Sequence, residues 1–179
     1  MLCKAFVKRI TGFGFCVALL ASISEPLLAC AAIPDSAPDI RGRPWINSAP
    51  LSLARLKGRV ILVDFWTYAC GNCRRALPYV ASWHERYAAS GLVVIGVHTP
   101  EFDDERIDAN VRAAVKRLGI RYPVVEDNDY RIWNGWCNRF WPALYLIDHT
   151  GRIVYHHFGE GDYTRTEAEI RALLAAANR

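Results

Sequence analysis

The sequence predicts an α/β fold in which a mixed β-sheet is flanked by helices on both faces. Apolar runs of strand length, Arg59–Trp66 and Leu92–His98 foremost, are continuous rather than alternating, which is typical of strands buried on both faces. Segments with apolar residues at helical spacing lie between these runs. The chain has 179 residues, 52% of them hydrophobic, which is enough for one domain with a proper core.

The first 31 residues predict a signal peptide for export. Lys4, Lys8 and Arg9 form a positively charged region, and residues 10–23 form a run of about 14 apolar or small residues, the length of a signal's hydrophobic part. A membrane-spanning helix needs roughly 20 apolar residues, so the run is too short for one. Ala29-Cys30-Ala31 offers a small-x-small cleavage site.

Two alternatives for this end stay open. The stretch from Leu27 to Cys30 also fits a lipoprotein signal that ends at Ala29 and leaves an acylated Cys30, and an uncleaved N-terminal segment could serve as a membrane anchor. All three interpretations place the domain in the periplasm or another extracytoplasmic compartment, where disulfides persist. Residues 32–44, with three prolines, are expected to form a linker or an extended lead-in to a domain over residues 45–179.

The first half of the domain predicts two strands, each followed by a helix. The strand Arg59–Trp66 leads into a helix over Asn72–Ser90, which stops at Gly91 and contains Pro78 as an expected kink. The strand Leu92–His98 leads into a second helix. The predicted elements that follow this strand are the helix Asp103–Leu118, the short strand Tyr122–Val125, a helical turn at Asp129–Gly135, the hairpin strands Ala143–Ile147 and Arg152–His157, and the capped final helix Thr164–Ala177.

Cys70 and Cys73 are separated by two residues at the point where the first predicted strand passes into a helix. A sulfur at a helix N-terminus faces free N–H groups and the positive end of the helix dipole, which stabilise a thiolate. A second thiol two residues further on can resolve the mixed disulfide that a thiolate forms. A zinc site would need about four ligands, and the sequence has neither a second CxxC nor a spaced histidine pair. The motif predicts a redox dithiol and no metal.

The order of elements, with this dithiol after the first core strand, resembles the thioredoxin fold. Asp64 takes the place of that family's buried carboxylate, Pro78 that of its helix-kinking proline, and Trp141-Pro142 that of its cis-proline loop. Over residues 45–178 the chain is similar to exported thioredoxins of the TlpA/ResA/DipZ type, and most similar to the DipZ-type soluble domain. The stretches that support this similarity are residues 65–68, 96–102, 122–124, 127–129, 141–143 and 158–161.

The resemblance implies a role for each residue of the site. Cys70 would be the exposed nucleophile, Cys73 the buried resolving thiol and Asp64 a proton acceptor for Cys73, although a hydrogen-bonded core aspartate is the alternative for Asp64. A cis Trp141–Pro142 bond would present backbone groups that bind a substrate chain as an added strand.

Trp66, Tyr68 and Trp141 would form an apolar seat for the substrate, with core packing as their alternative role. Cys137 is expected to be a small buried hydrophobic residue, with a third redox thiol or an intermolecular bridge as alternatives. His98 is expected at the solvent-exposed surface or in a turn.

We therefore expect an exported thiol–disulfide oxidoreductase that exchanges electrons with thiols and disulfides of exported proteins. By resemblance it would act as a reductant, for example in cytochrome c maturation, recharged by a membrane electron donor. It would be a monomer and would need no bound cofactor. A thiol peroxidase of the same fold and a copper carrier are the rivals. The net charge of +4 without a Lys/Arg block argues against nucleic-acid binding.

Overall fold

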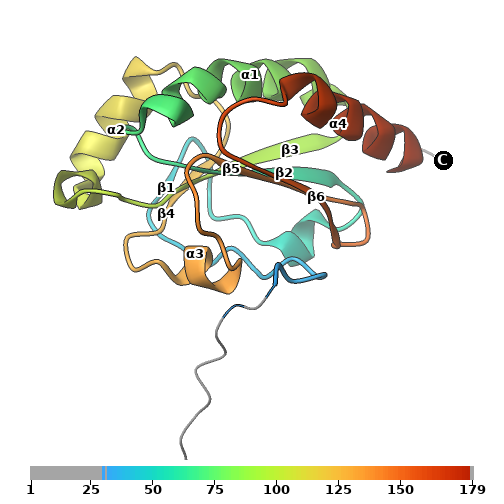
Figure 1. Ribbon diagram of the computed structural model, residues 1–179, viewed down its shortest axis with the longest axis horizontal. Coiled ribbons are helices and arrows are strands. Elements are labelled where there is room, and N and C mark those ends of the chain that lie inside the picture. The colour runs from blue at the N-terminus through green and yellow to red at the C-terminus, as the bar shows by residue number, and fades with distance from the viewer. Residues whose placement is uncertain (1–29, 31, 178–179) are drawn as a thin grey trace, which may run out of the picture.

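The computed structural model describes residue 30 and residues 32–177, which form a six-stranded sheet with helices on both of its faces (Figure 1). This confirms the predicted α/β class. Apart from Cys30, the predicted signal peptide lies outside the described residues. In the described part of the chain, no helix has the length and apolar character needed to cross a membrane.

The sheet is mixed, with the strand order β1-β4-β3-β2-β5-β6. The central strands β2, β3 and β4 are parallel, while β1, β5 and β6 run antiparallel to their neighbours. The strands are β1 (Trp45–Ile46), β2 (Val60–Trp66), β3 (Leu92–His98), β4 (Val124–Glu126), β5 (Ala143–Ile147) and β6 (Ile153–Phe158).

The helices α1 (Gly71–Tyr87), α2 (Asp108–Arg117) and α4 (Tyr163–Ala177) lie above the sheet in Figure 1, and α3 (Arg131–Gly135) lies below it. Three short 3-10 helices complete the set: η1 (Leu53–Leu56), η2 (Ala88–Ser90) and η3 (Asp103–Arg106). The single predicted helix over 103–118 is thus a 3-10 turn and an α-helix that meet at Ile107, whose backbone is extended.

Two hydrophobic cores occupy the two faces of the sheet, because side chains alternate along each strand. On β2, Leu62 and Trp66 point into the core beneath α1 and α4, while Val63 and Phe65 point into the core on the side of α3. Asp64 therefore lies on the same face as Leu62 and Trp66, where α1 covers it. This alternation places a carboxylate under the helix that begins beside the dithiol.

The segment of residues 32–44 lies against the domain. Ser36 forms a bridge with Arg152 beside β6, and Ile153 donates its backbone N–H to the carbonyl of Asp35 at 2.9 Å. Ile40 is buried in the α3-side core with 2% of its surface exposed. The stretch is therefore an extended segment that adds contacts to the sheet and to the core on the side of α3.

Cys30 and Cys137, which are 107 positions apart in the sequence, form a disulfide with their Cα atoms 5.3 Å apart. Cys137 follows the C-terminal end of α3 and is partly exposed. The main expectation for Cys137, a small buried hydrophobic side chain, is therefore wrong: its sulfur bonds covalently with the N-terminal end of the described chain.

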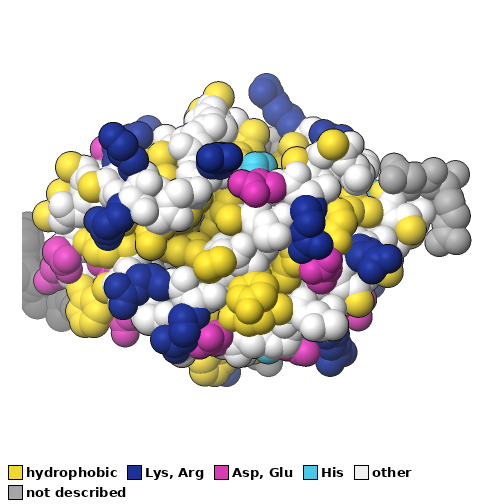
Figure 2. Space-filling view, turned by 90° about the horizontal axis from the view of Figure 1, so that it is seen from above, with side chains coloured by type: hydrophobic (Ala, Val, Ile, Leu, Met, Phe, Trp, Pro, Cys, Tyr) yellow, Lys and Arg dark blue, Asp and Glu magenta, His cyan; other side chains and the backbone are white. Residues whose placement is uncertain are grey.

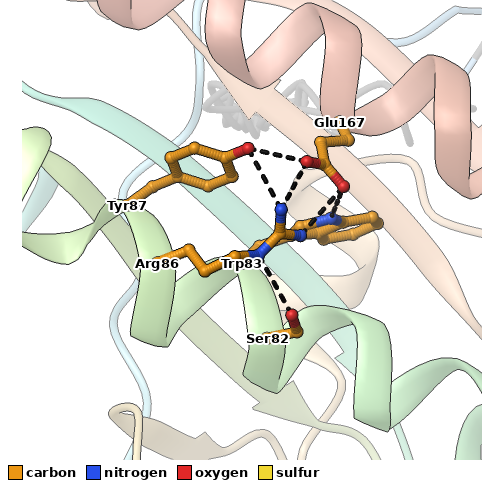
Figure 3. A network of polar contacts seen from close by, with 5 residues as sticks. All are labelled: Ser82, Trp83, Arg86, Tyr87 and Glu167. Carbon is orange, nitrogen blue, oxygen red and sulfur yellow. Dashed lines mark hydrogen bonds and ion pairs between the residues drawn. The ribbon is translucent and has the colours of Figure 1, made fainter.

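An ionic clasp joins α1 to α4 (Figure 3). The Glu167 carboxylate accepts hydrogen bonds from Arg86 at 2.6 and 2.9 Å, from the Trp83 indole at 3.1 Å and from the Tyr87 hydroxyl at 2.6 Å. The hydrogen bonds from Arg86, followed by that from Tyr87, lower the pKa of Glu167 to about 2. The two helices that cover this face of the sheet are thus tied to each other by one carboxylate.

The face formed by α1, α2 and α4 carries charges of both signs. Figure 2 shows Lys and Arg side chains interspersed there with acidic and apolar ones, so no patch of a single sign extends across it. The pattern agrees with the modest net charge of +4.

Candidate active site

Cys70 stands at the N-cap of α1, directly after the turn that follows β2. Its sulfur accepts a hydrogen bond from the backbone N–H of Cys73 at 3.2 Å, and it is partly exposed to solvent. The first free N–H groups of a helix point along its axis toward the cap, so they and the helix dipole favour negative charge on this sulfur. The structure therefore places Cys70 where the sequence predicted it.

Cys73 lies one turn further along α1 and is buried, with 1% of its surface exposed. Both thiols are free. Burial raises the pKa of Cys73 well above its ordinary value, and the neighbouring Cys70 sulfur and Asp64 carboxylate raise it further. In the dithiol form Cys73 keeps its proton, so it needs a base before its sulfur can attack.

Asp64 lies on the face of the sheet that α1 covers, the same side as Cys73, and 1% of its surface is exposed. Neither of its oxygens has a hydrogen-bond partner within the described part of the protein. Burial raises the pKa of Asp64 from 3.8 to about 7, and the nearby Tyr122 hydroxyl partly opposes the shift. A carboxyl group with this pKa can both take and return a proton near neutral pH.

The loop with Trp141 and Pro142 reaches the same edge of the sheet. Because Phe65 pairs with Ala143 in the antiparallel register of β2 and β5, Pro142 stands opposite the end of β2, where the turn to Cys70 begins. The bond between Trp141 and Pro142 is cis, as the resemblance implied. The carbonyl of Pro142 accepts the N–H of Gly159 at 2.8 Å.

The three aromatic residues expected around the dithiol differ in exposure. Trp66 is fully buried and belongs to the core, so any effect on a substrate would be indirect. Tyr68 and Trp141 are partly exposed and pack against the same core cluster as Cys70. The Trp141 ring also lies against that of Trp133, tilted by 37° with centroids 4.2 Å apart. Tyr68 and Trp141 are therefore the aromatic surfaces beside the dithiol.

Glu105, on η3, holds the turn before Cys70 and was not foreseen. It is fully buried, and its carboxylate accepts hydrogen bonds from the Thr67 hydroxyl and from the backbone N–H groups of Ala69 (2.9 Å), Glu101 (2.7 Å) and Phe102 (3.0 Å). In the sequence, Glu105 is the last residue of an acidic run, a pattern typical of a solvent-exposed surface. The sequence signal for this role is the position of Glu105 three residues after Phe102, a spacing at which a carboxylate can cap the start of a helix.

His98, at the end of β3, is also buried completely, so the expectation that it lies in solvent or in a turn is wrong. Its ring lies between Trp66, edge to face at 5.0 Å, and Tyr68, stacked at 5.6 Å. Burial lowers the pKa of His98 to about 4, with the charge of Glu105 opposing the shift. A neutral imidazole thus supports the aromatic surface beside the dithiol.

In residues 30 and 32–177, no three His, Cys, Asp or Glu side chains stand close enough together to hold a metal ion. The chemistry of the described site lies in two sulfurs, one buried carboxyl group and their polar neighbours.

Comparisons with known proteins agree with this geometry. Residues 33–156 match the model of the AhpC/TSA family. The chain is 49% identical over 143 residues to the protein DipZ of Mycobacterium tuberculosis, a match that covers 78% of this chain and 21% of DipZ. It is 24% identical over 139 residues to the thiol-disulfide oxidoreductase YkuV of Bacillus subtilis, which covers 77% of this chain and 93% of YkuV.

Among solved structures, the thioredoxin-like superfamily protein SPOA0173 superposes with a TM-score of 0.73 at 28% identity, covering 80% of this chain and 97% of that one. The chain thus spans about a fifth of the length of DipZ and nearly the whole of YkuV and SPOA0173.

Proposed function

The chain belongs to the AhpC/TSA family and has a thioredoxin-like fold, and from this premise we propose that it is an exported thiol–disulfide oxidoreductase acting on other exported proteins. One observation carries the proposal: Cys70 is partly exposed at the start of α1, with Cys73 and Asp64 buried on the same side of the sheet behind it. An exposed nucleophile, a resolving thiol and a base form the complete set for disulfide exchange.

The reaction begins when the Cys70 thiolate attacks one sulfur of a substrate disulfide. A bond forms between Cys70 and that sulfur, and the other substrate sulfur leaves as a thiolate that takes up a proton from solvent. Cys73 then passes its proton to Asp64, and its sulfur attacks Cys70. The bond between Cys70 and the substrate breaks, the second substrate thiolate leaves, and Cys70 and Cys73 are left joined by a disulfide. Two electrons have moved from the dithiol to the substrate.

The substrate would bind across the edge formed by Tyr68 and the loop of Trp141 and Pro142. The two aromatic side chains, which are partly exposed and pack against the same core cluster as Cys70, offer an apolar surface. The backbone before Pro142 offers hydrogen-bonding groups to an extended chain. This combination recognises an unfolded or flexible segment around a cysteine rather than one sequence. The substrate class would therefore be exported proteins with accessible disulfides.

We propose the reducing direction, with cytochrome c maturation as one use and a membrane electron donor to recharge the dithiol. The similarity to the thiol-disulfide oxidoreductase YkuV supports the exchange chemistry itself. The Cys30–Cys137 disulfide supports a compartment outside the cytosol, because structural disulfides are rare in reducing environments.

The same disulfide bears on the N-terminal alternatives. A sulfur bonded to Cys137 cannot at the same time carry a thioether-linked lipid, so we propose that the mature chain retains Cys30 and is not acylated there. Retention of Cys30 replaces the expected removal of residues 1–31, since cleavage after Ala31 would remove this cysteine. This favours release of the exported domain over a lipid anchor at Cys30.

The proposal is tested by mixing the reduced, purified protein with insulin and following the release of insulin thiols. We expect reduction that depends on Cys70, so Cys70→Ser should abolish it. A reduction potential of about −270 mV would support the reducing direction, whereas about −120 mV would indicate an oxidant.

Two other results would replace the proposal. A thiol peroxidase would reduce hydrogen peroxide far faster than insulin. Against it, the Thr99 hydroxyl is buried and donates to Asp127 at 3.2 Å. A copper carrier would bind Cu(I) stoichiometrically in its reduced form and leave insulin unreduced.

A further inference from the structure

A group of buried polar side chains surrounds Gly96 on β3, directly beside Asp64. In the parallel register of β2 and β3, Gly96 is the partner of Asp64. A Cβ atom at position 96 would lie 2.9 Å from the Trp66 indole nitrogen and 3.0 Å from Cε2 of Tyr122. The missing side chain of Gly96 therefore leaves the room that lets Tyr122 and Trp66 approach the strand next to the carboxylate.

The position of Tyr122 is held by its backbone neighbours. Asn47, just after β1, donates from its side-chain amide to the carbonyls of Ile120 at 2.9 Å and of Tyr122 at 3.0 Å. Gly96 donates its own N–H to the carbonyl of Pro123 at 2.9 Å. These bonds fix the backbone on both sides of Tyr122 beside β3, and the side chain of Tyr122 is fully buried.

Three buried polar groups meet here without hydrogen-bond partners in the described part of the protein: the Asp64 carboxyl oxygens, the Tyr122 hydroxyl and the Trp66 indole N–H. Buried polar groups are nearly always hydrogen-bonded, so each such exception calls for an explanation. Tyr122 also belongs to the same core cluster as Cys73. The explanation that fits all of these contacts lies in the proton transfer at Cys73.

We propose that Tyr122 is a positioning residue for this step, whose hydroxyl donates to the Asp64 carboxylate once that group has lost its proton. The inference rests on the proposed function. A charged carboxylate in an apolar core is costly unless a donor faces it. Tyr122 supplies a neutral donor, so Asp64 can be ionised at a lower pH than burial alone would allow and can then accept the Cys73 proton.

In the part of the chain that the structure describes, the Trp66 indole N–H is the other unpartnered donor beside Gly96. The titratable groups that face Asp64 or Tyr122 within the described residues are Cys73 and His84, both from α1; the His84 ring lies 5.9 Å from that of Tyr122. On β5, the partner of Asp64 is the apolar Leu144. Burial, followed by the charge of Asp64, raises the pKa of Tyr122 well above its ordinary value, so its hydroxyl stays protonated and remains a donor.

The test uses rapid mixing of the full-length reduced protein with an aromatic disulfide such as dithiobis(nitrobenzoate). The first phase reports attack by Cys70, and the second reports release of the mixed disulfide by Cys73. In Tyr122→Phe we expect an unchanged first phase, and a second phase whose pH profile moves up by about one unit. Its rate should therefore fall about tenfold on the acid side of the inflection and recover at high pH.

Two variants keep the result interpretable. Tyr155→Phe is the matched control, because it removes another buried tyrosine hydroxyl of the same core cluster, one that bonds to Thr166 at 2.9 Å. It should leave the profile unmoved. In an Asp64→Asn background, Tyr122→Phe should have no further effect on the profile, because the group it positions is gone.

A folded Tyr122→Phe protein with the wild-type pH profile would overturn the inference while leaving disulfide exchange intact. The same shift in Tyr155→Phe would also overturn it, since the effect would then belong to the core as a whole. If the wild-type protein itself showed no two-phase reaction, the proposed function would fail instead.

Discussion

The carboxylate of Glu105 accepts the backbone N–H of Ala69, the residue directly before Cys70, at 2.9 Å. Through this bond and the one from the Thr67 hydroxyl, a side chain from η3 holds the turn between β2 and α1. Two further N–H donors from the start of η3 complete four hydrogen bonds to one buried carboxylate, which offset the cost of burying its charge. The position of the nucleophile thus depends on a residue 35 positions away.

Glu105→Gln should loosen this turn. The amide keeps the shape of the side chain but replaces one acceptor oxygen with a donor that faces other donors. This should lower the free energy of unfolding by about 1–3 kcal/mol. Disulfide exchange should slow as the Cys70 loop loses its anchor. Chemical denaturation and insulin reduction measure the two effects, and the exposed neighbour Glu101→Gln is the control. Equal behaviour of both variants would leave Glu105 without a special role.

Cys73→Ser should accumulate mixed disulfides through Cys70, because the attacking thiol remains and the resolving thiol is gone. Non-reducing electrophoresis and mass spectrometry of the exported fraction would identify the trapped partners. Cys70→Ser should trap far fewer, since Cys73 is buried. Equal trapping by the two variants would reverse the assignment of roles.

Asp64→Asn should slow the release of the mixed disulfide and stabilise the fold at the same time. The pKa of Asp64 is about 7 in the folded protein against 3.8 as its ordinary value, so the wild-type protein loses stability as the pH rises from about 4 to about 7. The variant carries no charge to bury, so its free energy of unfolding at pH 8 should exceed that of the wild type by on the order of 2–4 kcal/mol. At pH 4 it should gain little. Chemical denaturation at pH 4 and pH 8 measures the difference in unfolding free energy between the two proteins. An equal difference at both pH values would show that the titration of Asp64 is not its cause.

Glu167→Gln should weaken the link between α1 and α4. Because the folded-state pKa of Glu167 is about 2, below its ordinary value, its contribution is present above about pH 4.5 and is lost as the pH falls toward 2. The pair is partly exposed, with 46% and 28% of the Arg86 and Glu167 side chains accessible, so we expect about 1 kcal/mol at neutral pH. The difference between the proteins should shrink near pH 2, as measured by thermal unfolding. A constant difference would assign the effect to packing.

Removing the disulfide with Cys30→Ser/Cys137→Ser should lower the unfolding free energy by about 2–5 kcal/mol, because the bond closes a long loop of the unfolded chain. Mass spectrometry of the mature wild-type protein, digested without reductant, should find the two cysteine peptides joined. A mature chain that begins after Cys30, or one with a lipid on Cys30, would contradict both the disulfide and the proposal that Cys30 is retained.

Much of the fold could be predicted because its signals are local. The apolar runs of β2, β3 and β5 and the helical stripes of α1 and α4 are each contained in one short window, so their periods show up in the sequence. The dithiol is an equally local signal, because its geometry depends on two cysteines within one helical turn. By contrast, β1 has only two residues, too few for any period, and its place is set by pairing with β4.

The order of the elements and the position of the dithiol follow from local patterns of the sequence. Which distant residues meet at the dithiol depends on the packing of the folded chain. The Cys30–Cys137 bond joins positions 107 apart, Glu105 reaches the Cys70 turn from another loop, and Tyr122 reaches Asp64 because the register of β2 and β3 sets Gly96 beside it. Periodicity and spacing act over a few residues, whereas these contacts depend on how whole strands and loops pack, which no short window of sequence contains.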